Sequence, residues 1–338
     1  MLKKLTETFG VSGYEKPVRE LIENEIKDYC DTLRTDSMGN LIAFRKARGN
    51  AENPKTVLLS AHMDEVGFIV TGISPDGYLY FDTVGGIDTK ILVSQNVRVN
   101  GHTGVISLKA VHLADKEERE KPVKQEQLYI DIGAKDKNDA LRYVMPGDYC
   151  CFDSDYVEFG DSVKAKALDD RVGCAVIIEM LKKNLNVNLY CTFTVQEEVG
   201  LRGAAAAVYG LQPDYALVIE ATTCNDMTGV PQNCTVTKLG GGAAISVLDS
   251  ASCANRELCR LLIHAAEKNG IPYQLKASTA GGNDAGAIYI SNGGIKTASL
   301  SVPCRYIHSP VCVMNKNDFQ SAAAITAAFL EELGKDAI

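Results

Sequence analysis

Several apolar runs in this chain end at a histidine or a carboxylate, and this pattern limits the folds that the sequence can adopt. Each run has the length of a buried strand. In open α/β sheets the ligand crevice lies beyond the carboxyl ends of the strands, where such residues would meet. The pattern therefore predicts an α/β sheet with a metal site at one edge. The polar residues in these positions are His62 and Asp64, Glu197 and Glu198, Glu220, and His308.

The bulk properties limit the number of domains and the class of partner. A length of 338 residues exceeds the usual size of a single hydrophobic core, so we expect two domains. The formal net charge of -8, without a local block of Lys and Arg, argues against nucleic acid as a partner.

The N-terminus and the cysteines bear on the cellular compartment. The first residues contain no apolar signal segment, and no apolar run is long enough to span a bilayer. The 11 cysteines show no CxxC pairing, and we expect most of them to be small apolar core residues. An odd number of cysteines without a signal peptide predicts a reducing, cytoplasmic environment and no membrane partner.

The chain changes character between residues 66 and 160. Short alternating stretches are separated there by turn signals such as Asn100-Gly101, which is typical of a small, barrel-like β unit. On either side the sequence alternates between strands and helices, with helices expected over residues 14–29, 170–183, 255–269 and 318–333. The predicted fold class is α/β: a mixed sheet flanked by helices, formed by residues 1–65 and 161–338, with a β-barrel-like domain inserted at residues 66–160.

His62 is the first candidate ligand, and Asp64 follows it by two positions. Residues two apart on a strand point to the same face, so Asp64 could hold the imidazole in a ligating orientation. A surface His–Asp pair at a strand end is the alternative reading of the same residues.

Asp169 and Asp170 come where an apolar strand over residues 165–168 is expected to end and a helix to begin. Because a helix N-terminus favours carboxylates, capping is the simpler explanation for Asp170. Asp169 lies ahead of the helix, where the two oxygens of its carboxylate could reach two metal ions.

Glu197 and Glu198 face opposite ways, so one could bind a metal ion while the other acts as a general base. Glu220 closes an apolar strand, where an unpaired charge is costly, and His308 lies in a loop after the last buried strand. Alone, the acidic pair could be a solvated turn and His308 an exposed loop residue. Together with His62 and Asp169, they favour a metal site at the edge of one sheet.

Four segments of the chain resemble the signatures of the M42 metallo-aminopeptidases. They occur in the family order, and the similarity runs nearly end to end. The β-rich insertion after the first segment also fits that family and argues against the related M20 group, whose accessory domain enters later. The segments are AHMDEVGF at 61–68, KALDDR at 166–171, QEEVGLRG at 196–203, and GNDAGA at 282–287 through SVPCRYIHSP at 301–310.

The resemblance implies a dinuclear centre with two divalent ions per subunit, zinc or cobalt being the usual metals. Carried over by motif, Asp169 would bridge the two ions. His62 and Glu220 would complete the coordination of one ion, and Glu198 and His308 that of the other.

The resemblance also implies roles for two further carboxylates. Glu197 would be the general base, and Asp64 would orient His62. A cis peptide bond is expected between Asp169 and Asp170. The chain departs from the family at Glu220, where Asp is more frequent; Glu is one methylene longer and can still ligate. Asp226 is the alternative ligand if the strand ends farther along.

The implied function is the removal of N-terminal residues from peptide substrates. The resemblance further implies a homo-oligomer, often a dodecamer, with the inserted domain serving assembly. Arg202, Lys238 and Arg305 could select acidic side chains or be structural, so acidic, apolar and broad specificity all stay open.

Three other functions compete with the aminopeptidase. A deacylase or carboxypeptidase could use the same metal core, and an endoglucanase-type glycosidase or a non-catalytic assembly protein could share the fold. The absence of Trp disfavours a sugar cleft, and the complete candidate ligand set with Glu197 disfavours an inactive protein.

Overall fold

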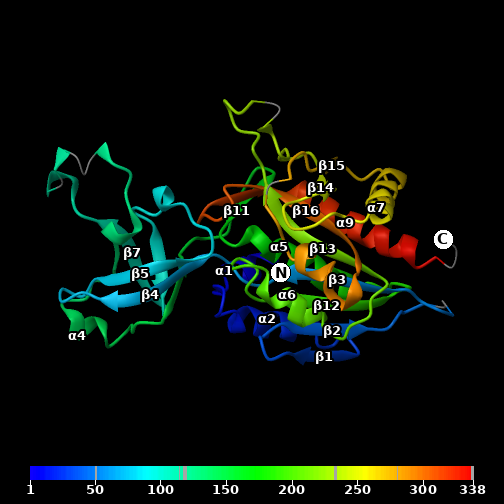
Figure 1. The fold of residues 1–338 in the computed structure, drawn as a ribbon, viewed down its shortest axis with the longest axis horizontal. Helices are drawn as coiled ribbons and strands as arrows, with labels where there is room; N and C mark the ends of the chain where they lie inside the picture. Colours follow the sequence, from blue (N-terminus) through cyan, green and yellow to red (C-terminus); the bar gives the residue numbers. More distant parts are fainter. Residues whose placement is uncertain (50–51, 114, 117–119, 232–233, 280, 336–338) are drawn as a thin grey trace.

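A mixed sheet of 11 strands and a separate closed barrel organise the chain (Figure 1). The computed structural model describes residues 1–49, 52–113, 115–116, 120–231, 234–279 and 281–335. The sheet strands are β1 (Thr32–Thr35), β2 (Leu41–Arg45), β3 (Thr56–His62), β10 (Val157–Phe159), β11 (Ser162–Ala165), β12 (Asn188–Thr194), β13 (Tyr215–Thr223), β14 (Ala243–Ser246), β15 (Tyr273–Leu275), β16 (Lys296–Arg305) and β17 (Cys312–Asn315).

The middle of the sheet consists of neighbouring parallel strands. The strand order is β1-β2-β12-β3-β13-β16-β17-β11-β10, with β14 and β15 attached beside β16. The pairs β12–β3, β3–β13 and β13–β16 are all parallel. The carboxyl ends of β12, β3, β13 and β16 therefore meet at one edge of the sheet.

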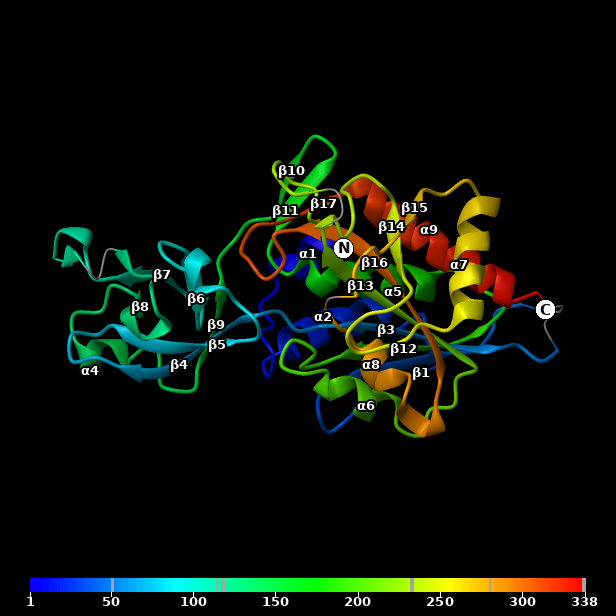
Figure 2. The ribbon, with the colours of Figure 1, turned by 45° about the horizontal axis from the view of Figure 1, so that its top comes forward.

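The alternation of side chains along these strands builds a different core on each face. On β3, Val57, Leu59 and Ala61 belong to the larger core, whereas Leu58 belongs to the smaller one. Figure 2 separates α7 and α9 from α6 and α8, with sheet strands between them. Helices on the larger core are α1 (Leu2–Glu7), α2 (Lys16–Ile26), α5 (Leu168–Lys182), α7 (Arg256–Lys268) and α9 (Lys316–Leu333); those on the smaller core are α6 (Arg202–Val208) and α8 (Ala285–Ile288).

The barrel closes in the order β4-β5-β8-β7-β6-β9 and has a core of its own. The ring of Phe68 packs edge-on against Phe81 and Phe152, with ring centres 5.3 and 5.0 Å away. Asn100 and Gly101 both have positive φ, of 47° and 81°, as a tight two-residue hairpin turn requires. The barrel elements are β4 (Gly67–Ile73), β5 (Leu79–Val84), β6 (Asn96–Val99), β7 (His102–Leu108), β8 (Leu128–Asp131), β9 (Tyr149–Phe152) and the helix α4 (Lys137–Ala140).

The predicted fold class is confirmed: a mixed α/β sheet flanked by helices, with a closed barrel inserted between β3 and β10. The division into domains at residues 66 and 160 stays a prediction. Within the described residues, no helix combines the length and the apolar character needed to cross a bilayer.

Two local predictions were wrong. The strand expected over residues 165–168 is β11, which ends at Ala165; Ala167 adopts positive φ, and α5 begins at Leu168. Glu220 was expected to end its strand, but β13 continues to Thr223 because it pairs with β16 as far as Cys304. Glu220 therefore lies inside a strand rather than in a loop.

Candidate metal centre

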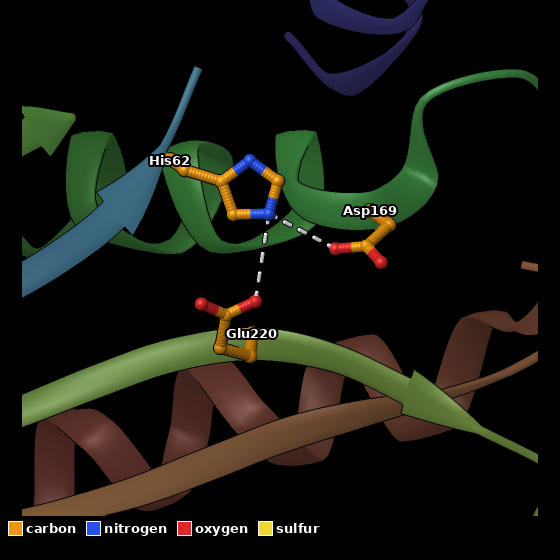
Figure 3. Close-up of side chains that lie close together, drawn as sticks. All are labelled: His62, Asp169 and Glu220. Carbon is orange, nitrogen blue, oxygen red and sulfur yellow. Dashed lines mark hydrogen bonds and ion pairs between the residues drawn. The ribbon is translucent and has the colours of Figure 1, made fainter. Parts of the chain in front are cut away.

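His62, Asp169 and Glu220 point toward one another at the carboxyl edge of the sheet (Figure 3). Val218 pairs with Ser60, so Glu220 is level with His62 on the same face of the sheet. His62 Nε2 lies 3.1 Å from Asp169 Oδ1 and 3.7 Å from Glu220 Oε2. These donor atoms lie within 4.8 Å of one another, close enough to share one ion.

A second group of donors lies on the other side of Asp169. His308 Nε2 is 3.1 Å from Glu198 Oε2 and 3.7 Å from Asp169 Oδ2. The donor atoms of this group also lie within 4.8 Å of one another. Asp169 thus directs one carboxylate oxygen toward His62 and the other toward His308, so the two donor groups share this carboxylate.

The peptide bond between Asp169 and Asp170 is cis, as the resemblance led us to expect. The two carboxylates have different partners. Asp170 Oδ1 accepts a hydrogen bond from Gly173 N at 3.0 Å, and Oδ2 accepts one from His62 N at 3.3 Å. Asp170 therefore holds the first turn of α5 and the end of β3, while Asp169 faces the donor groups.

Asp64 connects His62 to the turn that carries the glutamates. The closest oxygen to His62 Nδ1 is the backbone carbonyl of Asp64 at 3.1 Å, and the Asp64 carboxylate is slightly farther at 3.4 Å. The carboxylate accepts hydrogen bonds from Glu197 N at 3.0 Å, Glu198 N at 3.1 Å and Ser12 Oγ at 2.6 Å. Burial alone would raise the pKa of Asp64, but these bonds and His62 hold it below its usual value. Asp64 thus fixes the turn as well as the histidine.

His308 has an orienting partner that the sequence did not reveal. Its Nδ1 lies 2.8 Å from the backbone carbonyl of Gly86, in the segment that follows barrel strand β5. When Nδ1 carries the proton and donates it to a carbonyl, Nε2 is unprotonated and its lone pair is free to bind a metal ion. The partner is a main-chain atom from the barrel, so no residue type in the sequence could have identified it.

A buried ion cluster lies behind the site. Lys166 Nζ contacts both oxygens of Glu65, at 2.6 and 2.8 Å, and Arg171 Nη2 lies 3.5 Å from the same carboxylate. Arg171 Nε also donates to the carbonyl of Met63 at 2.8 Å. The cluster therefore connects the segment after β3 to Lys166, which precedes Asp169 in the chain, and to Arg171, which follows it. All three charged residues lie within the resemblance motifs, but no role was assigned to them.

The free carboxylates of the site are crowded and hold protons strongly. Burial and the charge of Asp284 raise the pKa of Glu197 to about 9, although His62 opposes the rise. Burial, with the charge of Asp170, raises the pKa of Glu220 well above its usual value. Burial would lower the pKa of His62, but Glu220 and Glu197 raise it well above the ordinary range. The site therefore lacks positive charge that divalent cations would supply.

The donor set fits such ions. Glu220 Oε1 is buried and, among the described residues, has no hydrogen-bond partner. A buried carboxylate oxygen without a partner is costly unless a cation pairs with it. Mixed histidine and carboxylate ligation suits zinc and similar borderline divalent ions.

A cavity of about 590 Å³ opens over both donor groups. Glu197 lines it beside the donors, and Lys276 lines it from the segment after β15. Asp226, the alternative to Glu220, is committed elsewhere: its carboxylate pairs with Arg305 Nε and Nη2 at 2.7 and 2.9 Å. The structure therefore favours Glu220 over Asp226 as the ligand from β13.

Known proteins match this chain over nearly its whole length. The model of the family described as M42 glutamyl aminopeptidase matches residues 39–325. A protein of Acetivibrio thermocellus, provisionally named an aminopeptidase, is 41% identical over 96% of this chain and 96% of its own. The lysyl aminopeptidase of Pyrococcus furiosus is 31% identical over 98% of this chain and 96% of its own.

Solved structures agree with the sequence matches. An aminopeptidase from the archaeon Desulfurococcus kamchatkensis has a TM-score of 0.93 and 35% identity, covering 100% of this chain and 97% of that one. The TET1 peptidase of Pyrococcus horikoshii has a TM-score of 0.85 and 37% identity, with 97% of each chain covered. A structure from Thermotoga maritima named as an endoglucanase has a TM-score of 0.82 and 36% identity, covering 98% of this chain and 97% of its own.

We expect His308→Ala to lower the zinc content of the protein to about half, because only the second donor group loses a ligand. Elemental analysis of zinc-reconstituted, gel-filtered protein measures this. His264→Ala is the control, since His264 lies exposed on α7. Unchanged zinc content in His308→Ala would remove His308 from the site.

We expect the chelator-treated protein to lose stability as the pH rises from about 6 to about 8.5. The folded-state pKa of Glu197 is raised from 4.5 to about 9, so the folded state binds more protons than the unfolded state across this range. The raised pKa values of His62 and His308 act in the same direction, whereas the lowered pKa of Asp64 acts only in acid. Between these two pH values, stability is therefore greatest near pH 6 and is lost as the pH approaches the folded pKa values of about 9.

The melting temperature of metal-free protein at the two pH values tests this expectation. Zinc should reduce the loss because bound cations replace the protons, and Glu197→Gln should also reduce it. A melting temperature that rises with pH in the metal-free protein would contradict the charge balance described for this cluster.

Proposed function

The chain belongs to the M42 glutamyl aminopeptidase family and is an aminopeptidase; from this premise we propose that it removes N-terminal residues from peptides at a centre of two divalent metal ions, with Glu197 as general base. The observation that carries the proposal is the position of Asp169, whose two oxygens face separate donor groups.

The two donor groups define which residues would hold the ions. His62 and Glu220 would hold one ion, Glu198 and His308 the other, and Asp169 both. Bound divalent ions would supply Lewis acidity, polarising the scissile carbonyl and making water more acidic. Zinc and cobalt are the metals that we propose.

The position of Glu197 supports a role in proton transfer rather than as a ligand. It lines the cavity but belongs to neither donor group, and its Oε2 lies 3.9 Å from His62 Nε2. Its backbone is fixed by the hydrogen bond from its N–H to Asp64. A carboxylate in this position would take a proton from water at Oε2 and return it to the departing amine.

The charge of the cavity supports a preference for a free N-terminus. Glu197, Glu198 and Glu220 gather at one end of the cavity, where bound divalent ions would lower their pKa values and leave them ionised, and an α-amino group is a cation at neutral pH. The attraction would hold the N-terminal residue beside the donor groups. N-acetylation removes this charge, so a free amine would be required.

The arrangement of the site does not support the alternative function of an endoglucanase-type glycosidase. The relative from Thermotoga maritima carries that name, but here the carboxylates pair with histidines instead of facing each other across an open cleft. The chain also contains no Trp, the residue that commonly forms sugar platforms. The deacylase and carboxypeptidase readings are separated from ours by the requirement for a free amine.

We also propose a homo-oligomer assembled through the barrel, up to a dodecamer. The TET1 peptidase of Pyrococcus horikoshii is described as assembling into a tetrahedron or a large octahedral shell. The barrel exposes large apolar side chains that suit such contacts, among them Tyr80, Leu141 and Met145.

A cytoplasmic location stays a prediction that rests on the 11 cysteines, all of which are free.

Aminoacyl p-nitroanilides test the function directly, each compared with its N-acetylated counterpart. We expect chelator to abolish hydrolysis, zinc or cobalt to restore it, and cleavage to be confined to the free-amine compounds. Cleavage of both series would indicate a less discriminating amidohydrolase. No cleavage of either would contradict the proposed aminopeptidase.

Glu197→Gln should reduce kcat by about 100- to 10,000-fold, because the amide cannot accept the proton from water. Zinc content should stay unchanged, since Glu197 belongs to neither donor group. Glu331→Gln, an exposed change on α9, is the matched control. Activity retained in Glu197→Gln would exclude Glu197 as the base.

A further inference from the structure

We propose that Glu15, which belongs to neither donor group, is a positioning residue for the reaction: its carboxylate holds the turn that carries Glu197 in the conformation that proton transfer needs. The inference rests on the proposed aminopeptidase function, in which Glu197 is the general base.

The turn that carries Glu197 has an unusual backbone. It connects β12 to α6, and within it Gln196 and Leu201 adopt positive φ of 56° and 57°, which residues other than Gly rarely do. Such a conformation persists only where the surrounding groups fix it. Because Gln196 directly precedes Glu197, its conformation sets the direction in which the Glu197 side chain leaves the backbone.

Three consecutive N–H groups of this turn are bound by two carboxylates. Gln196 N donates to Glu15 Oε1 at 3.2 Å. Glu197 N and Glu198 N donate to the carboxylate of Asp64 at 3.0 and 3.1 Å. Asp64 therefore fixes the two glutamates, and Glu15 fixes the residue with positive φ that precedes them.

Helix capping does not account for the Glu15 side chain. Glu15 is the N-cap residue of α2, where a side-chain oxygen can accept hydrogen bonds from the first N–H groups of its own helix. Glu15 makes no such bond. Its Oε1 instead accepts the N–H of Gly13 at 2.7 Å together with that of Gln196. The carboxylate is thus directed at the turn rather than at the helix.

The Glu15 carboxylate is buried without a cation. The residue is 5% exposed, and among the described residues none forms an ion pair with it. Burial raises the pKa of Glu15, and the hydrogen bond from Gly13 opposes the rise. A buried carboxylate needs hydrogen-bond donors, and the two N–H groups supply them here. The bond to Gln196 therefore has little competition from solvent.

The segment that carries Glu15 is also fixed to the segment after β3. Ser12 N donates to the carbonyl of Glu65 at 3.3 Å, and Glu65 N donates to the carbonyl of Gly10 at 2.9 Å. Ser12 Oγ donates to Asp64 Oδ2 at 2.6 Å. Residues 10–15 therefore contact both the segment after β3 and the turn after β12, and they fix one relative to the other.

The ends of the turn have separate support. Asn40 Oδ1 accepts the N–H of Val195 at 2.9 Å, and Asn40 Nδ2 donates to the carbonyl of Gly203 at 3.0 Å. Loss of the Glu15 side chain should therefore leave β12, α6 and the donor Glu198 in place. Only the local conformation before Glu197 should change, so mutation can separate positioning from folding.

Three substitutions of Glu15 separate its reach from its charge. Glu15→Gln keeps an oxygen at the same distance, Glu15→Asp keeps the charge but is one methylene shorter, and Glu15→Ala removes both. With the zinc-loaded enzyme and the aminoacyl p-nitroanilide that it cleaves fastest, we expect Glu15→Ala and Glu15→Asp to lower kcat by about 10- to 100-fold, as a small displacement of a reacting group does. KM and zinc content should stay unchanged, and Glu15→Gln should retain most of the activity. Glu23→Ala, an exposed change on α2, is the matched control.

A double-mutant comparison shows whether Glu15 acts through Glu197. In the Glu197→Gln background, which lacks the base, Glu15→Ala should cause no further loss of kcat. The full loss in that background would overturn the inference, as would unchanged kcat in Glu15→Ala or a Glu15→Gln variant as slow as Glu15→Ala. A fall in zinc content that parallels the fall in kcat would show that Glu15 supports the whole turn, and would overturn a role specific to Glu197.

Hydrogen exchange separates this inference from the proposed function. If the zinc-loaded protein cleaves none of the anilides, the aminopeptidase proposal fails, and the exchange rate of the Gln196 amide decides on Glu15. Faster exchange of this amide in Glu15→Ala, with the amides of α9 unchanged, would support the contact. Equal exchange in Glu15→Ala and the unaltered protein would overturn it.

Discussion

The parallel alignment of β12, β3, β13 and β16 is the constraint on which the site depends. It brings residues more than 150 positions apart, such as His62 on β3 and Glu220 on β13, within 3.7 Å of each other. The register is strict, because a shift of one residue would turn Glu220 from the site into the larger core on the opposite face. The apolar residues that alternate with the ligands, such as Ile219, prevent that shift. The packing of the core and the geometry of the site are therefore determined by the same strands.

The energetic character of the centre follows from its burial. Burial raises the pKa of Glu197 to about 9 and that of Glu220 well above its usual value, and an oxygen of Glu220 has no partner among the described residues. Hydrogen bonds partly offset this cost at the edge of the cluster, where Asp64 accepts three donors. Behind the cluster, Lys166 and Arg171 form ion pairs with Glu65, so the negative charge of Glu65 is balanced by its own partners. The protein thus pairs its supporting carboxylates internally, whereas the central Glu220 keeps an oxygen without a partner among the described residues.

The sequence predicted the fold class and the residues that meet at the sheet edge, because strand ends and helix starts follow from periodicity and turn residues. Asn100-Gly101 marked its hairpin correctly. The sequence could not predict the extent of β13, because pairing with β16 extends the strand beyond Glu220. Lys276 and Gly86 also escaped notice: the first lies in a loop without a motif, and the second acts through its carbonyl. Whether the five predicted ligands bind metal stays a prediction.

Both histidines of the centre are oriented by backbone carbonyls, of Asp64 and of Gly86. Every amino acid supplies the same carbonyl, so the identity of the residue at position 86 is under little constraint from this contact. A Cβ there would lie 3.6 Å from His308 Nδ1, an ordinary contact distance. The length of the segment, however, determines where the carbonyl lies. Over evolutionary time, the loop after β5 should therefore tolerate changes of residue type far better than insertions or deletions.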